Sequence, residues 1–458
     1  MATLELTGRS SSPAAAGQTA VAPSDLQTRL LHGLLWASVL LNFVLCFIDT
    51  NIFAVDQSLV IAGEAAILAT AVAVPFMGGG RHPGRWDLLL ILLLLNWLIL
   101  SLIRQYADPK LFRDVAIIPI FIVAGLACRG DKLHITIFRI HMLVLAFALW
   151  EAISLNSFIS VFNVSGYFAH TRGLSPDEWW IENGLYVSSI RPEARFIFPG
   201  LPVHRLSSVF LEPVSLGNYV VIATLWLVGF WHHLPRKIAI TAAIATALLL
   251  VGSDSRLATV CCMILLLAAP FKRHLTAATA LLVAPAVIAA TFIAVSLLQL
   301  RPGLDDFPGR VAYGVYTLRS FGVEDFAGLS LDLIESTQDA GFAYVINSHS
   351  VMMAIILWIV IFARRLVTPE SRYIHFAIAL YLSLNLIVSW SLFSIKTAGL
   401  LWFLLGHAIA MDKGAALGLV ARKLRSTKQA PAWTRPTQVG LDAEVPAGRY
   451  RRARTSLR

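Results

Sequence analysis

Long apolar runs alternate with short polar links along most of the chain. Each run has about the 20 residues that an α-helix needs to cross the hydrocarbon core of a membrane, or somewhat fewer. Backbone N–H and C=O groups find no water in that core, so we expect the runs to be helices. The pattern predicts an all-α, polytopic transmembrane bundle of about twelve spans, at residues 30–48, 58–76, 87–103, 114–128, 135–155, 208–230, 238–252, 256–270, 275–298, 343–363, 373–392 and 396–411.

Two polar segments are much longer than the other links, and they cover about 156–207 and 299–342. Both contain Pro, Gly, Asp, Arg and aromatic residues, which is unlike a low-complexity spacer. In the first, the sequence SPDEWW that begins at Ser175 has a capping Ser, then Pro, then acids, as at the start of a helix. Its two Trp residues suit a short helix at the membrane surface.

The distribution of Lys and Arg predicts the orientation, because cytoplasmic links of membrane proteins collect basic residues. Two basic residues stand in each of five alternate links, at 81–85, 128–132, 232–237, 271–274 and 363–365. The link at 104–114 is an exception on the other side, with three. We therefore expect both termini in the cytoplasm and the two long loops outside.

These boundaries divide the chain into seven regions. They are a cytoplasmic N-terminal tail (1–29), N-terminal spans (30–155), a first periplasmic loop (156–207), central spans (208–298), a second periplasmic loop (299–342), C-terminal spans (343–411) and a basic cytoplasmic tail (412–458).

Composition supports a membrane protein, with 57% hydrophobic and 14% charged residues. Soluble domains carry about 25% charged residues. Basic links and tails account for the net charge of +10, so we expect no nucleic-acid partner. The four cysteines lie in or beside apolar runs without metal-ligand spacing, and we expect no metal and no cofactor.

Three polar clusters fall on the predicted outer side, where charged groups at membrane depth tend to be functional. In the first, Asp254 and Arg256 stand in a turn between two spans of about 15 residues. Two spans that short place the turn near lipid phosphates, which match the planar fork of an arginine. Asp254 would orient Arg256. A plain ion pair that closes the turn is the alternative.

The second cluster precedes the sixth span. Arg205 stands just outside it, and Glu212 and Pro213 fall within its first turns, followed by Gly217. A glutamate inside an apolar run is expected to face protein or a watery cavity. We expect Pro213 to break the helix there and to free backbone groups. An interfacial Glu212 that reaches the surface is the alternative.

The third cluster belongs to the second long loop and its exit. Its members are Arg310, Arg319, Asp339 and His349. His349 is a candidate proton acceptor because its ordinary pKa is near neutral. A structural, hydrogen-bonding histidine is the alternative.

With these elements the chain resembles the O-antigen polymerase and O-antigen ligase superfamily of bacterial inner-membrane proteins. The resemblance rests on three short motifs between about 200 and 365: an Arg-Phe-Glu-Pro-Gly pattern entering a central span (Arg205, Phe210, Glu212, Pro213 and Gly217), a Ser-Arg turn (Ser255-Arg256), and an Asp-x-Gly-Phe element before a span (Asp339 to Phe342). The Arg-x-x-Ser-x-Phe-x-Glu-Pro sequence is most similar to exopolysaccharide and capsule polymerases.

The resemblance implies a glycosyltransferase of the inner membrane. Its substrate would be an undecaprenyl-pyrophosphate-linked oligosaccharide, which it would polymerise at the periplasmic face. Pyrophosphate would be held by Arg205 and Arg256 with Arg310 or Arg319, and the acceptor would be oriented or deprotonated by Glu212, Asp339 or His349. Membrane lipids, a flippase and a chain-length regulator are the implied partners.

Other functions stay open at this point. A ligase would move the glycan to lipid A core or to protein. A flippase or other transporter is a different class, although carriers of this size commonly have two similar halves and a long central cytoplasmic link. A structural partner in an envelope complex is a further alternative.

Overall fold

Helices make up the protein: in the described residues of the computed structural model, 81% of the chain is helical and no strand occurs. The structure describes residues 25–77, 84–128, 130, 132–174, 184–190, 195–303, 307–331, 333 and 336–428, with side chains up to 418 except at 336 and 338. The chain forms two compact units, Met1–Ala415 and Ala416–Arg458. The bundle and all sites below belong to the first unit. The described part of the second is the end of a helix.

Each of the twelve expected spans overlaps a helix or a broken pair of helices. The helices are α1 (Asp25–Asn51), α2 (Gln57–Ala73), α3 (Arg85–Arg104), α4 (Pro109–Ala127), α5 (Lys132–Ile153), α8 (Pro213–Phe230), α9 (Arg236–Ser253), α10 (Arg256–Ala268), α11 (Ala277–Leu297), α14 (Gly341–His349), α15 (Val351–Phe362), α16 (Pro369–Val388) and α17 (Ile395–Lys428). Among the described residues, nine helices are long and apolar enough to cross a membrane, and the bent pair α14–α15 would make a tenth. Two helices at expected spans are not among the nine, because α10 has only 13 residues and α4 carries three charged residues in its first turns.

The two long polar segments contain short helices. The first holds α6 (Leu155–Val161), α7 (Val164–Arg172) and the 3-10 turns η3 (Val187–Ser189) and η4 (Ser208–Phe210); the second holds α12 (Phe307–Ser320), α13 (Val323–Ala327) and η7 (Ser336–Asp339). The predicted helix start at Ser175 lies outside the described residues, as do the tails 1–24 and 429–458. We call the end of the bundle where these segments lie, and where α8 and α17 begin, the loop end.

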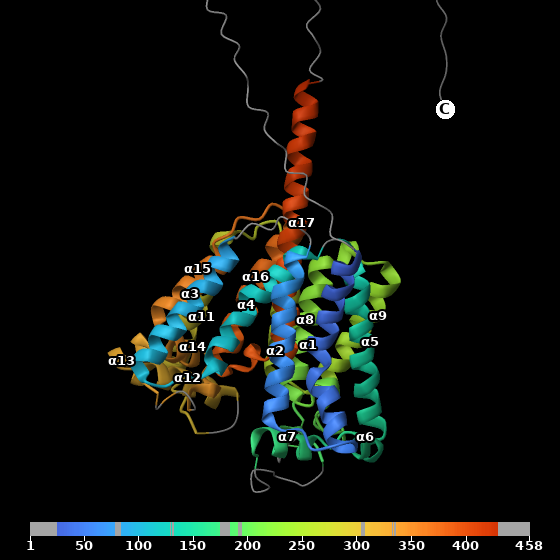
Figure 1. The fold of residues 1–458 in the computed structure, drawn as a ribbon, viewed down its shortest axis with the longest axis vertical. Coiled ribbons are helices and arrows are strands. Elements are labelled where there is room, and N and C mark those ends of the chain that lie inside the picture. The colour runs from blue at the N-terminus through green and yellow to red at the C-terminus, as the bar shows by residue number, and fades with distance from the viewer. Residues whose placement is uncertain are drawn as a thin grey trace, which may run out of the picture. The chain divides into compact units, whose positions relative to one another are not determined.

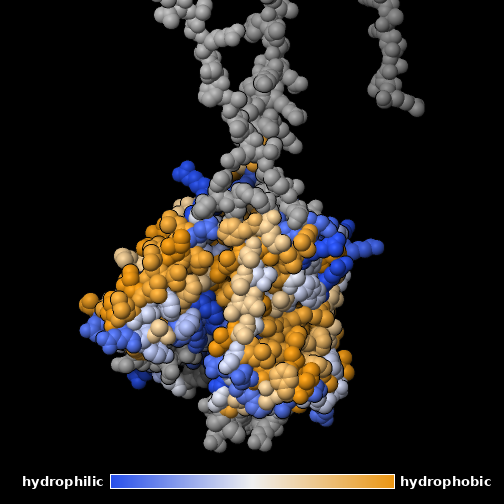
Figure 2. Space-filling model, in the orientation of Figure 1, coloured by the Kyte–Doolittle hydropathy of each residue, from blue (hydrophilic) through white to orange (hydrophobic). Residues whose placement is uncertain are grey.

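Helix α8 lies at the centre of its neighbours and is buried along nearly its whole length. It packs against α9, α10 and α16, while α11 packs on α16, and α3 on α4. Figure 1 shows α3, α11, α12, α14 and α15 together on one side of the first unit, and α1, α2, α5 and α9 on the other. Figure 2 shows hydrophobic side chains over the outward helix faces. Leucines such as Leu102, Leu267 and Leu297 are exposed, as expected for a surface that contacts lipid.

Several predicted boundaries are wrong. The sixth predicted span corresponds to α8, which begins at Pro213 and not at residue 208. Pro213 therefore starts this helix and does not break it. Proline is favoured at the first helical position because its missing N–H would have no partner there. Helix α9 has 18 residues, so only α10 of that pair is short. Helix α17 continues past residue 411 to Lys428, where we had expected a tail.

The tenth predicted span is broken in the middle. Helices α14 and α15 meet at Ser350 with a bend of 109°, and Ser350 has a φ of 73°. A break frees carbonyl groups that must be satisfied at membrane depth. Helix α3 supplies the donors: Arg104 binds the carbonyls of Asn347 and Ser348 at 2.7 and 3.2 Å, and Asn96 donates to the carbonyl of His349.

Glycines bring α4 and α17 into direct backbone contact. A Cβ on Gly406 would lie 2.1 Å from the carbonyl oxygen of Ile122, and one on Gly125 equally close to that of Phe403. Small residues at helix contacts allow such an approach in membrane proteins. The contact holds the first turns of α17 where Lys396 enters the site described below.

We predict that Gly406→Ala destabilises the protein by about 1–3 kcal/mol, because the added methyl must push backbone apart. The measurement is the thermal unfolding midpoint in detergent. Gly33→Ala on α1 is the matched control, since a Cβ there meets no atom within 4 Å. The control should be neutral or slightly stabilising, because Ala favours a helix over Gly. Equal midpoints for the two variants would contradict the close contact.

Candidate functional site

Glu212 is the centre of the polar structure at the loop end. It occupies the N-cap position of α8, directly after Leu211, whose backbone is left-handed. The side chain of Glu212 is 12% exposed. One carboxylate oxygen lies 2.6 Å from Nη1 of Arg172 on α7. The other binds Nζ of Lys396 on α17 and accepts a hydrogen bond from Ser215. We call Arg172, Glu212 and Lys396 the ion triad. Glu212 thus faces protein, which is one of the alternatives expected from the sequence.

The two cations decide the ionisation of Glu212. Burial alone would raise the pKa of its carboxyl group, but the charges of Arg172 and Lys396 lower the pKa to about 2. Glu212 is therefore ionised throughout the neutral range. A carboxylate with so low a pKa is a weak proton acceptor. Its chemistry fits an orienting group better than a base.

The exposure of the triad is uneven. The side chain of Lys396 is 1% exposed and donates to the carbonyl of Phe210 at 3.0 Å. The side chain of Arg172 is 46% exposed, so its guanidinium keeps access to solvent while Glu212 orients it. The triad has one more positive than negative charge. Arg172 can therefore receive an anion, with a planar fork that matches phosphate oxygens.

Tyr186 connects the ion triad to the second long loop. Its phenol bonds to Arg172, and burial followed by the charge of Glu212 raises the pKa of Tyr186 to about 12. Asp339 of η7 lies near enough to contribute to the same rise. Asp339 is 61% exposed at its side chain and lies 3.7 Å from Arg310 of α12. The structure thus brings Asp339 and Arg310 together, and Asp339 and Glu212 both act electrostatically on Tyr186.

A second charged group lies on α2 and α4. Arg113 pairs with Glu64 at 2.5 Å and with Asp114 at 2.7 Å, and Asp114 accepts a hydrogen bond from Tyr344. Lys110 lies 4.3 Å from the ring centre of Trp390. These residues account for the basic link at 104–114 that departed from the predicted charge pattern. Figure 2 shows hydrophilic side chains in a hollow between two hydrophobic surfaces.

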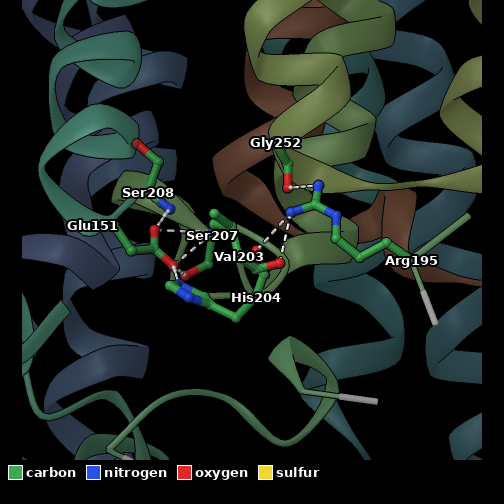
Figure 3. Close-up of polar contacts among 7 residues, drawn as sticks. All are labelled: Glu151, Arg195, Val203, His204, Ser207, Ser208 and Gly252. Carbon is green, nitrogen blue, oxygen red and sulfur yellow. Dashed lines mark hydrogen bonds and ion pairs between the residues drawn. The ribbon is translucent and has the colours of Figure 1, made fainter. Parts of the chain in front are cut away.

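The approach to α8 is fixed by Glu151, a buried carboxylate at the end of α5. It accepts hydrogen bonds from the backbone N–H groups of Ser207 and Ser208, at 2.6 to 3.1 Å, and from His204 at 3.0 Å (Figure 3). Ser208 and Leu211 have positive φ values, which non-glycine residues adopt only when their surroundings impose them. Glu151 therefore holds the irregular turn that presents Glu212.

Arg195 fixes the other side of the same segment. Its guanidinium binds the carbonyls of Val203 and His204 at 2.7 and 3.1 Å, and that of Gly252 at 3.3 Å (Figure 3). The first loop is thereby tied to the end of α9. Arg205 strengthens the same contact, since its Nε donates to the carbonyl of Ser253 at 3.1 Å. Arg205 is 4% exposed, so it lies inside the protein and not at its surface.

The turn between α9 and α10 differs in part from the prediction. Asp254 is buried and its backbone is left-handed. Its carboxylate accepts hydrogen bonds from the backbone N–H groups of Phe196 and Ile197. It therefore orients the first loop, where we had expected it to orient Arg256. Arg256 begins α10, with its guanidinium carbon 5.5 Å from the ring centre of Phe196.

Gly217 places the turn against the start of α8. A Cβ on Gly217 would lie 2.7 Å from Ser255, so the second turn of α8 touches this turn directly. Arg256 follows Ser255, and Gly217 follows Glu212 by five residues. The first two predicted clusters therefore meet in one place.

His349 and Arg319 lie apart from that place. His349 is 2% exposed at the end of α14, beside the break that Arg104 clamps. Arg319 reaches towards α11, where it donates to Ser296 at 2.9 Å. Within the described ranges, no group of three or more His, Cys, Asp or Glu side chains could hold a metal ion.

Several residues of the site were missed in the sequence. Glu151 and Lys396 each stand inside or at the edge of an apolar run, and the criterion that found Glu212 could have found them. Arg172 and Arg195 lie in the first loop without a local signal, because only the fold shows what they contact.

Comparisons of the chain with models of known protein families, with curated proteins and with solved structures find no match. Function is therefore inferred from the site itself.

We predict that Glu151→Gln loosens the segment before α8. Hydrogen bonds to a charged group contribute about 1.5–3 kcal/mol, and an amide oxygen accepts more weakly than a carboxylate. Hydrogen exchange of the Ser207 and Ser208 amides should therefore become faster, with a lower unfolding midpoint. Glu324→Gln, at an exposed position on α13, is the control and should change neither. Unchanged protection of both amides would exclude this role of Glu151.

Proposed function

We propose that the protein is a glycosyltransferase of the bacterial inner membrane that polymerises undecaprenyl-pyrophosphate-linked oligosaccharides at the periplasmic face. The observation that carries the proposal is the ion triad. A buried Glu212 holds the half-exposed Arg172 at the loop end, and the exposed Asp339 of the second loop acts electrostatically on Tyr186, which bonds to Arg172. An oriented cation beside an accessible carboxylate suits a reaction in which a pyrophosphate leaves and a hydroxyl loses its proton.

The proposed topology has twelve spans, both termini in the cytoplasm and the loop end in the periplasm. Its support is the position of basic residues at the opposite end of the helices. Arg85 begins α3, Arg236 begins α9, and Lys272 and Arg273 follow α10. Arg364 follows α15. This pattern agrees with the rule that cytoplasmic links carry the positive charge.

In the proposed reaction, an acceptor hydroxyl oxygen attacks the anomeric carbon of the donor sugar. The bond from that carbon to the pyrophosphate oxygen breaks, the lipid pyrophosphate leaves, and the hydroxyl proton passes to a carboxylate. Arg172 and Arg256 would bind the pyrophosphate and offset its developing charge. Asp339 would accept the proton, since its carboxylate is exposed and Glu212 is a weak acceptor.

A transporter of the same lipid-linked substrate is the second candidate. The broken pair α14–α15 favours it, because discontinuous helices build the substrate sites of many carriers. The charged residues inside α2 and α4 are also typical of transport pathways.

Purified protein in detergent separates the two candidates, because detergent has no second compartment. With lipid-linked oligosaccharide repeats alone, a polymerase should produce a ladder of longer glycans on a gel. A transporter should leave the single repeats unchanged, and that result would exclude the proposal.

In this assay we predict that Arg172→Gln lowers the rate roughly a hundredfold, as expected for the loss of about 3 kcal/mol of transition-state stabilisation. Arg172→Lys should recover little, since it keeps the charge but loses the second aligned donor. Arg301→Gln, at an exposed position after α11, is the control and should be near normal. A rate within a few-fold of wild type for folded Arg172→Gln would remove Arg172 from the site.

The orientation generates a separate prediction. Reporter fusions at about residues 180 and 325 should indicate a periplasmic location. Fusions at about 83, 235 and 420 should indicate a cytoplasmic location. A cytoplasmic result at 180 or 325 would place the ion triad on the wrong side for a periplasmic reaction.

A further inference from the structure

A groove runs between α11, α12, the start of α14 and the end of α16. It is shallow and open on one side, with a free volume of about 20 Å³. Its wall is almost wholly apolar and includes Thr291 and Phe292 of α11, Leu318 of α12 and Phe342 of α14. Apolar space of this kind is poorly filled by water, which needs polar partners.

The groove lies beside a surface that faces lipid. Leu282, Ile293 and Leu297 of α11 are 63%, 58% and 77% exposed. Figure 1 shows α11 and α12 on the side of the first unit away from α5 and α9. A hydrocarbon chain from the bilayer can therefore enter the groove without crossing the protein.

Arg319 stands beside the groove, next to its lining residue Phe292. It follows Leu318, and its guanidinium carbon lies 5.5 Å from the ring centre of Phe292 and 6.0 Å from that of Tyr316. One Nη donates to Ser296. Among the residues that the structure describes, no carboxylate lies within ion-pair distance of Arg319. The other arginine of α12, Arg310, is paired with Asp339.

Charge decides which amphiphile fits. One guanidinium without a carboxylate matches the single negative charge of a phosphodiester, and its remaining N–H groups can bind two phosphate oxygens. A pyrophosphate carries more charge than this one arginine offsets. Flanking aromatic rings suit the depth of lipid headgroups.

We propose that the groove binds one acyl chain of an anionic glycerophospholipid whose phosphate lies on Arg319. The site is separate from the ion triad and does not depend on the proposed reaction. A bound lipid would also fix α12, which carries Arg310 to Asp339.

Native mass spectrometry of the detergent-solubilised full chain tests the proposal without any glycan substrate. The probes are phosphatidylglycerol and phosphatidylcholine with identical acyl chains, undecaprenyl phosphate and inorganic phosphate. Wild type should retain one phosphatidylglycerol about tenfold more tightly than phosphatidylcholine, a difference of about 1.4 kcal/mol.

Matched variants assign that preference to the groove. Arg319→Gln should abolish the preference, while Arg301→Gln should keep it. Thr291→Trp should fill the groove and weaken the binding of both phospholipids. Leu318→Trp replaces it if the first variant unfolds.

Three results would overturn the proposal. The first is an unchanged preference in Arg319→Gln. The second is displacement of phosphatidylglycerol by much lower concentrations of undecaprenyl phosphate. The third is full competition by inorganic phosphate with no effect of the groove-filling variants.

Discussion

The ion pair between Glu212 and Lys396 is the interaction on which the loop end depends. It joins the start of α8 to the start of α17 across 184 residues of sequence, and Arg172 adds the first loop. Breaking a buried pair by removing one partner costs about 3–5 kcal/mol, because the other charge is left without compensation. The position of Arg172, and with it the charge offered to a ligand, is therefore set by residues from three distant segments.

Charged side chains in this protein mainly satisfy irregular backbone. Glu151 binds the N–H groups before α8, Arg195 binds carbonyls of the first loop and α9, and Arg104 binds those at the break of α14. Irregular backbone is tolerated at membrane depth only where protein supplies partners. Glu151 and Arg104, each at the end of an apolar run, thus mark places where the main chain departs from a helix.

The helices were largely predictable from the sequence, and the site only in part. Apolar length predicts a spanning helix because the bilayer imposes that length, and each expected span overlaps a helix. Helix starts were less certain, as Pro213 shows. Glu212 could be singled out by its local sequence, but its partners Arg172 and Lys396 could not, since pairing across long separations depends on packing. The same reason explains why Arg205, expected to hold pyrophosphate, and Asp254, expected to orient Arg256, instead bind backbone.

The clamp at the break of α14 has a consequence for biogenesis. Arg104 is synthesised 224 residues before Gly328, whose carbonyl it binds together with those of Asn347 and Ser348. At about 5–20 residues per second, the ribosome needs on the order of tens of seconds to make that stretch. Until then Arg104 has none of these acceptors. Its place at the very end of α3 lets the side chain reach the headgroup region while it waits, so the break can be completed late without an unsolvated charge in the membrane.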